Sequence, residues 1–389
     1  MDFKHQFFSS LTALGRKVYL VAGYHYLAMD NELLAKKICV KKQKTKLKLS
    51  KEDIKAYREK WKPLGKCIKT IHLENAFEYA GISDPNIVPS NIYYAAIEPA
   101  LNNLAFSLGY EDKARIDWLN DPQHVPHIFL RNIHGNYYSA EQQVIDRASI
   151  DVDRLINTET CIIAKKSIEL HAGKGVVVFD KKTDGAFYNK EGQKLSLEWL
   201  ENTFQQDFIV QKFVDQHEYY KKFNPTSLNT FRIFTYRSVK DNKVHVIYSY
   251  LRVGAPGKRV DNICEGGMFV CVKEDGHFAD FGFSYGSEKI YALDGYPPFT
   301  EMERPYKIDE IWETAKKIAS THLYSRLLGF DIAVDNDGKI LHIETNTSEI
   351  GMEHVQYVIG PLFHRFTDEI IEYTQKKLKT VPYYKLYSN

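Results

Sequence analysis

The sequence contains no long apolar run, no closely spaced cysteine pair and no marked excess of charge of either sign. No stretch approaches the roughly 18–20 consecutive apolar residues that a transmembrane helix requires. The five cysteines are scattered and form no CxxC pair, which disfavours a disulfide framework or a zinc site and favours a reducing compartment. Fifty-two Lys and Arg residues nearly balance 50 Asp and Glu residues. Nucleic-acid binding is therefore not favoured, because a phosphate backbone normally needs a strongly basic face.

Several catalytic signatures are also missing. There is no GxxxxGK(S/T) phosphate loop and no HExxH zinc helix. Residues 282–286 match the GxSxG pattern of serine hydrolases, but the segment that follows contains Gly295 and Pro297 and cannot form the required helix, so we expect a loop there. Ser9 and Arg16 are among the residues that interrupt the apolar residues of the N-terminus, which therefore lacks a signal-peptide pattern. The expected location is the cytoplasm.

The composition and the N-terminal part of the chain indicate a globular protein. The 389 residues are enough for two or three lobes, and 44% apolar with 26% charged residues is an ordinary balance. Residues 1–108 are predicted to be mainly helical, with Ser50 and Asp53 capping a helix that runs through 54–58. Seven lysines fall within 36–48. Such a run is either a solvated face or a contact with an anionic membrane surface or an acidic glycan.

From about residue 109 the pattern changes to strands separated by turns. Segments 240–243 and 335–338 are typical hairpin turns between strand-like runs. The predicted strands are 161–164, 176–179, 208–210, 231–236, 244–253, 330–334 and 340–343, and the predicted helices are 197–206, 309–327 and 361–378. The predicted fold class is α+β, behind a helical N-terminal region.

Three oxygen-bearing side chains gather in the last predicted hairpin. Asp331 lies on its first strand, and Glu344 and Asn346 lie two residues apart on its second, so the last two point to one face. Carboxylate and amide oxygens suit an Mg²⁺ ion that holds nucleotide phosphates. The alternative is a polar, exposed sheet face without a metal.

Basic residues and glycines further upstream offer phosphate contacts. Lys165 and Lys166 end an apolar strand, and Gly173, Lys174 and Gly175 open the next one. A lysine at a strand end can reach phosphate oxygens, and glycines let backbone N–H groups approach a ligand closely. The Gly-Lys-Gly segment could equally be a plain hairpin turn.

Two further features favour a nucleotide or another anion. The segment from Gln211 to Glu218 could offer backbone groups to an adenine edge and a carboxylate to ribose, or it could be a surface connection. Arg232 and Arg252 lie in otherwise apolar strands, where a guanidinium group is costly to bury unless it meets an anion. The two arginines therefore favour an anionic ligand.

Taken in order, these segments resemble the ATP-grasp superfamily, and most closely its sugar-transfer-associated branch, which is found in polysaccharide biosynthesis. The resemblance covers residues 109–370. The segments that carry it are Asp112-Lys113, Lys165 with Gly173–Gly175, Gln211–Glu218, Ser227–Ile233, Leu251-Arg252, Val260–Asn262 with Gly266-Gly267, Asp331 and Glu344–Asn346.

The resemblance implies a two-lobed fold that grips ATP between antiparallel sheets, with an ATP-grasp domain at 109–389, a small lobe at about 155–212 and a large lobe at about 213–375. It also implies ligand-binding roles for individual residues. ATP would contact Lys113, Lys165, Lys166, Gly173, Lys174, Gly175, Gln211, Val214, His217, Glu218 and Asn229, and two Mg²⁺ ions would contact Asp331, Glu344 and Asn346. The catalytic residues would be Arg232 and Arg252, which face the γ-phosphate and the acyl phosphate, together with Asn262. The family often has Lys-Pro where this chain has Lys165-Lys166, so either lysine could point inward.

The implied activity is that of an ATP-dependent carboxylate–amine ligase that acts through an acyl phosphate. Its expected substrates are a sugar acid, or a glycan that carries one, and an amino acid or amine, joined during the synthesis of capsule or another surface polysaccharide. One alternative is an ATP-grasp kinase that phosphorylates a hydroxyl or carboxylate without ligation. Another is a non-catalytic nucleotide-binding scaffold, although a scaffold would not need a complete set of metal ligands.

Overall fold

The N-terminal helices begin and end where local side chains and glycines allow it. The computed structural model describes residues 14–15, 18, 48–65, 68–168, 175–259, 266–284, 288–351 and 353–380. Helix α2 spans Lys51–Trp61. Ser50 Oγ accepts the Asp53 N–H (3.0 Å) and the Asp53 carboxylate accepts the Ser50 N–H (3.2 Å), which confirms the predicted cap. Gly81, with a φ of 69°, ends α3 (Ile71–Ala80). The elements that follow are α4 (Ser90–Ile92), the π-turn Tyr93–Ile97, α5 (Glu98–Leu101), α6 (Leu104–Ser107) and α7 (Ile116–Leu119).

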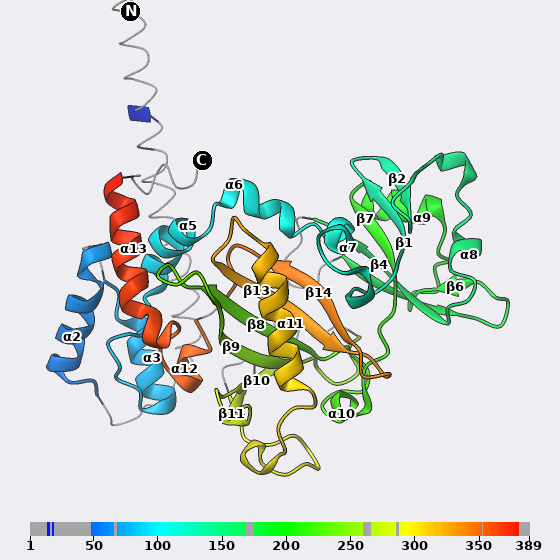
Figure 1. Cartoon of the computed structure of the whole chain (residues 1–389). Coiled ribbons are helices and arrows are strands. Elements are labelled where there is room, and N and C mark those ends of the chain that lie inside the picture. Colours follow the sequence, from blue (N-terminus) through cyan, green and yellow to red (C-terminus); the bar gives the residue numbers. More distant parts are fainter. Residues whose placement is uncertain are drawn as a thin grey trace, which may run out of the picture.

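The first sheet has seven antiparallel strands in the order β3-β2-β1-β7-β4-β5-β6 (Figure 1). They are β1 (Ile128–Ile133), β2 (Asn136–Ser139), β3 (Val144–Ile145), β4 (Cys161–Lys166), β5 (Val176–Lys181), β6 (Phe187–Tyr188) and β7 (Phe208–Lys212). Helices α8 (Val152–Leu155) and α9 (Leu197–Phe204) contribute Val152, Leu200 and Phe204 to its core. Because β1 pairs with β7, this sheet begins at Ile128, earlier than the lobe boundary expected at about 155.

The second sheet also has seven antiparallel strands, in the order β12-β11-β10-β9-β8-β13-β14. They are β8 (Thr230–Arg237), β9 (Val244–Val253), β10 (Met268–Val272), β11 (Phe278–Ser284), β12 (Lys289–Ile290), β13 (Leu327–Val334) and β14 (Ile340–Asn346). The two predicted hairpin turns join β8 to β9 and β13 to β14. Helix α11 (Ile308–Thr321) packs its buried residues Ile311 and Ala315 on one face of this sheet, and α10 (Glu218–Lys221) lies on the connection between the two sheets.

The structure differs from the sequence prediction at three elements. Helix α11 ends at Thr321 and not at 327, because Leu327 opens β13 and is completely buried there. Helix α13 (Thr367–Thr380) begins later than 361, after a 3-10 turn at 364–366. The prediction of a loop at the GxSxG pattern is wrong for the first residues of the pattern, because residues 282–284 belong to β11. A Cβ at Gly282 would lie 2.5 Å from the carbonyl oxygen of Phe269 on the neighbouring strand β10, so close strand pairing requires glycine at this position.

The N-terminal helices cover the other face of the second sheet. One apolar cluster joins Tyr57 and Trp61 of α2 to Tyr236 of β8 and Ile370 of α13. Figure 1 shows α2 and α3 beside α13 and α12 (Gln356–Ile359), at the end of the molecule away from the first sheet. The helical N-terminal region and the second sheet therefore share a single core.

Two sequence expectations concern membranes. Within the described ranges, no helix combines the length and the apolar content that crossing a bilayer requires. The predicted lysine-rich face at 36–48 lies outside the described residues except for Lys48.

Candidate active site

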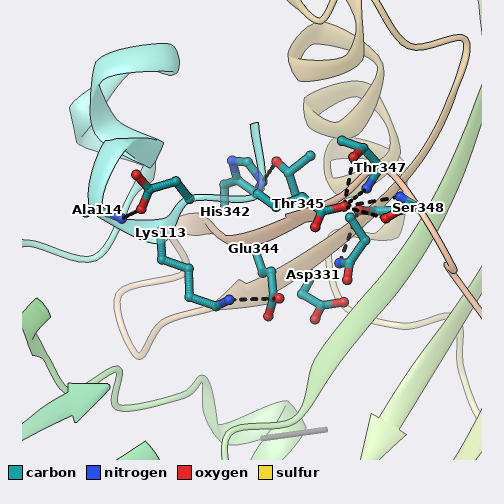
Figure 2. Close-up of polar contacts among 12 residues, drawn as sticks. Lys113, Ala114, Asp331, His342, Glu344, Thr345, Thr347 and Ser348 are labelled. Atoms are coloured by element: carbon teal, nitrogen blue, oxygen red, sulfur yellow. Dashed lines mark hydrogen bonds and ion pairs between the residues drawn. The ribbon is translucent and has the colours of Figure 1, made fainter. Parts of the chain in front are cut away.

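Two lysines and two carboxylates from distant parts of the chain meet where the two sheets approach each other. Lys113, which follows α6, places its Nζ 3.0 Å from Glu344 Oε1 on β14 (Figure 2). Lys165, at the end of β4, is only 7% exposed. Burial and, to a smaller extent, the charge of Lys113 lower the pKa of Lys165 to about 8, although Glu344 and Asp331 act in the opposite direction. The four charged groups therefore lie within electrostatic reach of one another.

The β13–β14 hairpin sets the positions of the three predicted metal ligands. Asp331 pairs directly with Glu344, and Gly329 pairs with Asn346, as the predicted hairpin requires. The register skips Ile343, so the strand bulges there. A bulge re-aims the side chains on either side of it. Thus the buried His342 bonds Thr345 (3.0 Å), while Glu344 and Asn346, two residues apart on the paired part of β14, share the other face.

The two embedded arginines meet a protein carboxylate. Arg252 Nη2 lies 2.7 Å and Arg232 Nη2 lies 3.2 Å from Asp331 Oδ2, and Arg232 is directly opposite Asp331 in the β8–β13 register. Burial raises the pKa of Asp331, but the two guanidinium groups outweigh it and lower the pKa below its usual value. Asp331 is therefore an anion at neutral pH. The sequence predicted an anionic ligand near these two arginines, and the structure shows that one anion they contact is the carboxylate of Asp331.

The structure distinguishes the two adjacent lysines at the end of β4. Lys166 Nζ donates to the backbone carbonyl of Gln206 (2.7 Å), away from the carboxylates, whereas Lys165 is buried beside them. Successive side chains of a strand point to opposite faces, so only one of the two can face the junction. Lys165 is the one that does.

The predicted adenine and ribose segment runs along the connection between the sheets. Gln211 is buried in β7 and donates its side-chain amide to Pro126 O (3.0 Å), and Val214 is also buried. The His217 ring stacks on Tyr306 (centroids 4.1 Å apart), and its backbone N–H donates to Val334 O (2.9 Å). Glu218 opens α10. This connection is thus fastened to the end of β13, on the same hairpin that carries Asp331.

Asn229 lies under this connection. Its Nδ2 donates to Gln216 Oε1 (2.8 Å) and to the carbonyls of Tyr220 and Asn224 (2.8 and 2.9 Å). Its Oδ1 is buried with no hydrogen-bond partner among the described residues. The amide nitrogen of Asn229 therefore stabilises the loop, and only its oxygen is left for any further contact.

Three of the predicted residues, Gly173, Lys174 and Asn262, lie outside the described residues. Gly175 is described and has a φ of 77°, a conformation that favours glycine, just before β5.

The donor set fits Mg²⁺ bound together with phosphates better than a metal held by protein alone. Among the described residues, no three His, Cys, Asp or Glu side chains converge in a way that could hold a metal ion. Glu344, whose side chain is 29% exposed, and Asn346 offer oxygens on one face, and Asp331 lies opposite. Mg²⁺ is commonly bound by one or two carboxylates plus substrate phosphates.

Sequence reasoning missed Glu111, two residues before Lys113. Its Oε1 accepts hydrogen bonds from the backbone N–H groups of Thr347 (2.7 Å) and Ser348 (3.1 Å) and from both of their hydroxyls (2.8 and 3.3 Å). Thr347 and Ser348 directly follow Asn346 at the end of β14 (Figure 2). Glu111 therefore fixes the chain immediately after a predicted metal ligand.

Glu98, the first residue of α5, and Asn102, which directly follows this helix, also contact the loop after β14. Asn102 Nδ2 donates to Thr347 O (2.7 Å), and the carboxyl group of Glu98 accepts the backbone N–H of Glu349 and the hydroxyl of Tyr93 (2.9 Å). Glu98 is 3% exposed, and burial raises its pKa to about 8. Segment 98–111 thus binds loop 347–349 at three points, and the helical N-terminal region forms part of the candidate site.

The family comparison identifies the class of protein with this arrangement. A profile of the family described as sugar-transfer associated ATP-grasp matches residues 97–370. The chain belongs to this family, which confirms the resemblance seen in the sequence. Enzymes of the ATP-grasp superfamily use ATP with Mg²⁺.

Comparison with solved structures and curated sequences adds the following. The chain is similar to N5-carboxyaminoimidazole ribonucleotide synthetase from Thermotoga maritima (10% identity, 67% of this chain and 49% of that chain, TM-score 0.34). It is also similar to an L-amino acid ligase from Bacillus licheniformis (12% identity, 69% of this chain and 48% of that chain, TM-score 0.35). A third similar structure is the ATP-grasp ligase PsnB complexed with a precursor peptide and AMPPNP (13% identity, 70% of this chain and 62% of that chain, TM-score 0.38). The matched part spans about half to three-fifths of these proteins. No curated protein sequence matches this one.

Proposed function

We propose that this protein is an ATP-dependent carboxylate–amine ligase. The observation that carries the proposal is the convergence of Lys113 and Lys165 with Asp331 and Glu344 at the junction of the two sheets. Two cations beside hard oxygen ligands are what an Mg²⁺-bound triphosphate needs, since each phosphate charge must be balanced when it leaves water.

In the proposed reaction, a carboxylate oxygen of the acid substrate attacks the γ-phosphorus of ATP, and the bond to the β-phosphate oxygen breaks to release ADP. An amine then attacks the carbonyl carbon of the acyl phosphate, inorganic phosphate leaves, and the amine loses a proton as the amide forms. Mg²⁺, for which we propose two ions, would supply charge neutralisation at the phosphates.

The residues of this chain have the following roles in the proposal. Lys113 and Lys165 bind phosphate oxygens, and Glu344 with Asn346 supplies metal ligands from one face of β14. Arg232 and Arg252 keep Asp331 ionised and oriented, because both guanidinium groups hydrogen-bond its carboxylate. Most of this work is positioning and charge compensation, so no covalent nucleophile is required.

The substrate class rests on the family description alone. We propose a sugar acid or an acidic glycan as the carboxylate, an amino acid or amine as its partner, surface-polysaccharide synthesis such as that of capsule as the setting, and the cytoplasm as the location.

A screen for ADP release tests the activity. Sugar acids are combined with amino acids and amines in the presence of ATP and Mg²⁺, and ADP and free phosphate are measured. We expect ADP and phosphate only when both an acid and an amine are present. ADP without any amine requirement, together with a phosphorylated product, would indicate the kinase alternative, and ATP binding without turnover in any mixture would indicate the scaffold.

Substitution of Glu344 tests the metal assignment. Glu344→Ala should abolish ADP release while the melting temperature changes little, because the side chain is partly exposed at the edge of the junction. Glu310→Ala on α11, whose side chain is 62% exposed, is the matched control and should keep full activity. Undiminished turnover in Glu344→Ala contradicts the assignment.

A further inference from the structure

A cavity lies at the other end of β9 from the candidate active site. Strand β10 ends at Val272, which pairs with Ser249, so residues 244–248 of β9 extend past it. The resulting notch is walled by α11 on one side and by segment 359–365 on the other, and its volume is about 500 Å³. Sites for small molecules typically enclose roughly 300–1,000 Å³. Along β9, the seven residue-to-residue steps from His245 to Arg252 correspond to roughly 23 Å at the usual strand rise.

Cationic side chains reach this cavity from three separate elements. Lys273 follows β10, Lys316 lies on α11 and Arg365 lies just before α13, against a single lining carboxylate, Glu274. Among the described residues, no carboxylate lies within ion-pair distance of Arg365, whose guanidinium group rests on the ring of Phe366 (4.6 Å). Lys273 has only a long contact of 4.0 Å with Asp280. Lys316 Nζ pairs closely with Glu313 Oε1 (2.6 Å), so the lining cations without a close carboxylate partner among the described residues are Lys273 and Arg365.

Two imidazoles complete the polar lining. His364 stacks on Tyr248 (centroids 5.0 Å apart), and its Nε2 lies 3.2 Å from Ile247 O. The Nε2 atom of His245 is buried and has no hydrogen-bond partner among the described residues. Buried polar atoms are nearly always paired, so an unpaired one that lines a cavity indicates a missing partner.

The electrostatics show that these groups converge. Burial lowers the pKa of His245 and of His364, and the charge of Arg365 lowers both further. Lys316 also lowers the pKa of His245, whereas Asp241 and Glu369 raise it. For His364, the nearby carboxylates of Glu274 and Asp84 raise the pKa. One guanidinium group is thus close to both rings.

Trp312 of α11 adds an aromatic ring to the cavity lining. The indole N–H of Trp312 donates to Ser249 Oγ (3.0 Å), which fixes the orientation of the ring at the cavity. A fixed indole gives a flat apolar surface to the uncharged body of a ligand.

We propose that this cavity binds a small organic anion, whose phosphate or carboxylate group contacts Arg365, Lys273 and the His245 ring and whose uncharged body lies against Trp312. Phosphate and carboxylate share this recognition, because both accept charge-assisted hydrogen bonds from guanidinium and ammonium groups. The site is separate from the lysine–carboxylate junction and does not depend on the proposed ligase activity.

Calorimetric titration of the full chain with three probes tests the proposal. The probes are inorganic pyrophosphate, glucose 1-phosphate and citrate. We expect saturable binding of at least one probe, weakened roughly tenfold or more in the double variant Arg365→Gln/Lys273→Gln, since each lost charged contact costs about one kcal/mol or more. Binding of glucose 1-phosphate without citrate identifies the ligand group as phosphate, and the reverse identifies it as carboxylate.

Two matched variants localise the binding. Lys317→Gln changes an exposed lysine next to Lys316 that does not line the cavity, and it should bind the probes as the parent does. Lys165→Gln removes a lysine that the proposed function assigns to phosphate, so it reports any probe bound at the junction and should leave binding in the cavity unchanged. The proposal is overturned if none of the probes binds at millimolar concentration, if the double variant binds as tightly as the parent, or if Lys165→Gln alone abolishes binding.

Fluorescence gives an independent readout. The chain has four tryptophans, so a ligand-induced change in emission that is present in the parent and absent in Trp312→Phe places the ligand in this cavity. An identical change in both proteins contradicts the site. If the double variant does not fold, as judged by its melting curve, the single variant Arg365→Gln provides the same test, because no carboxylate among the described residues pairs with Arg365.

Discussion

The two sheets have the same number of strands, but they are stabilised in different ways. The core of the first sheet is formed by its own strands with α8 and α9. The second sheet is covered by α11 on one face and by the N-terminal helices with α12 and α13 on the other. The comparison shows that the predicted metal ligands lie on a broadly supported body, whereas Lys165 lies on a lobe that fewer elements cover.

Few contacts join the two lobes outside the connecting chain. Lys113, whose turn packs against β1 and β7 of the first sheet, reaches Glu344 on β14 (3.0 Å), and Arg259 from the loop after β9 bonds Asp180 (2.6 Å) and the Cys161 sulfur (3.3 Å) of the first sheet. The predictions below test this difference between the lobes.

The largest expected effect comes from removing a large aromatic residue from each core. Trp61→Ala and Phe179→Ala should each destabilise the protein by about 3–5 kcal/mol, because both side chains are completely buried. In chemical denaturation, Trp61→Ala should lower the transition of the N-terminal helices and the second sheet together, and Phe179→Ala should lower that of the first sheet. A Trp61→Ala variant in which only the N-terminal helices unfold would contradict the shared core.

A pH-dependent effect is expected within the shared body. Burial raises the pKa of Glu98 to about 8, so its protonated form contributes stability that is full below the unfolded value of 4.5 and is lost as the pH rises toward 8. The melting temperature of Glu98→Gln should depend less on pH than that of the parent. At pH 8–9 the free energy of unfolding of the variant should exceed that of the parent by an amount on the order of a few kcal/mol. Parallel melting curves for the two proteins between pH 5 and pH 9 would rule this out.

Glu111 tests how the N-terminal segment supports the candidate site. Glu111→Ala should cost about 1–3 kcal/mol locally, because two N–H groups and two hydroxyls lose their acceptor. We expect faster amide hydrogen exchange at 347–349 and a lower kcat with a smaller change in KM. Glu111→Gln keeps one acceptor oxygen and should recover most of the activity. If alanine and glutamine behave alike, Glu111 does not act as a positioning residue.

The smallest effect is expected at the contact between the lobes. Arg259→Gln removes a pair whose side chains are 40% and 46% exposed, so its cost in stability should be less than about 1 kcal/mol. The change should appear in solution scattering as a more open average shape, with an unchanged melting temperature. Lys258→Gln, one residue earlier, is the control. Identical scattering from the variant and the parent would mean that this pair does not restrain the lobes.

The sequence predicted local features better than long-range ones. The β13–β14 hairpin follows from the turn residues at 335–338 and the apolar runs beside them, and it places Asp331 opposite Glu344 without any knowledge of the rest of the fold. The cap at Ser50 is equally local. Such features depend on residues a few positions apart, where pattern and conformation are closely linked.

The contacts that complete the site could not be predicted in this way. Glu111 binds residues 236 and 237 positions further along the chain, and nothing in its surroundings distinguishes it from a surface glutamate. The bulge at Ile343 depends on the register with β13, and the choice of Lys165 over Lys166 depends on which face of β4 meets the second lobe. Each of these is decided by tertiary packing.

The shared core also has a consequence for preparing the protein. The family match begins at 97 and ends at 370, but the apolar cluster reaches from Tyr57 to Ile371. Trimming the gene to the matched range would remove α2 and α3, cut α13 near its start, and leave buried aromatic rings such as Tyr357 in contact with water. A truncated product of this kind should aggregate during expression, and soluble yield will depend on keeping residues well outside the conserved-domain limits.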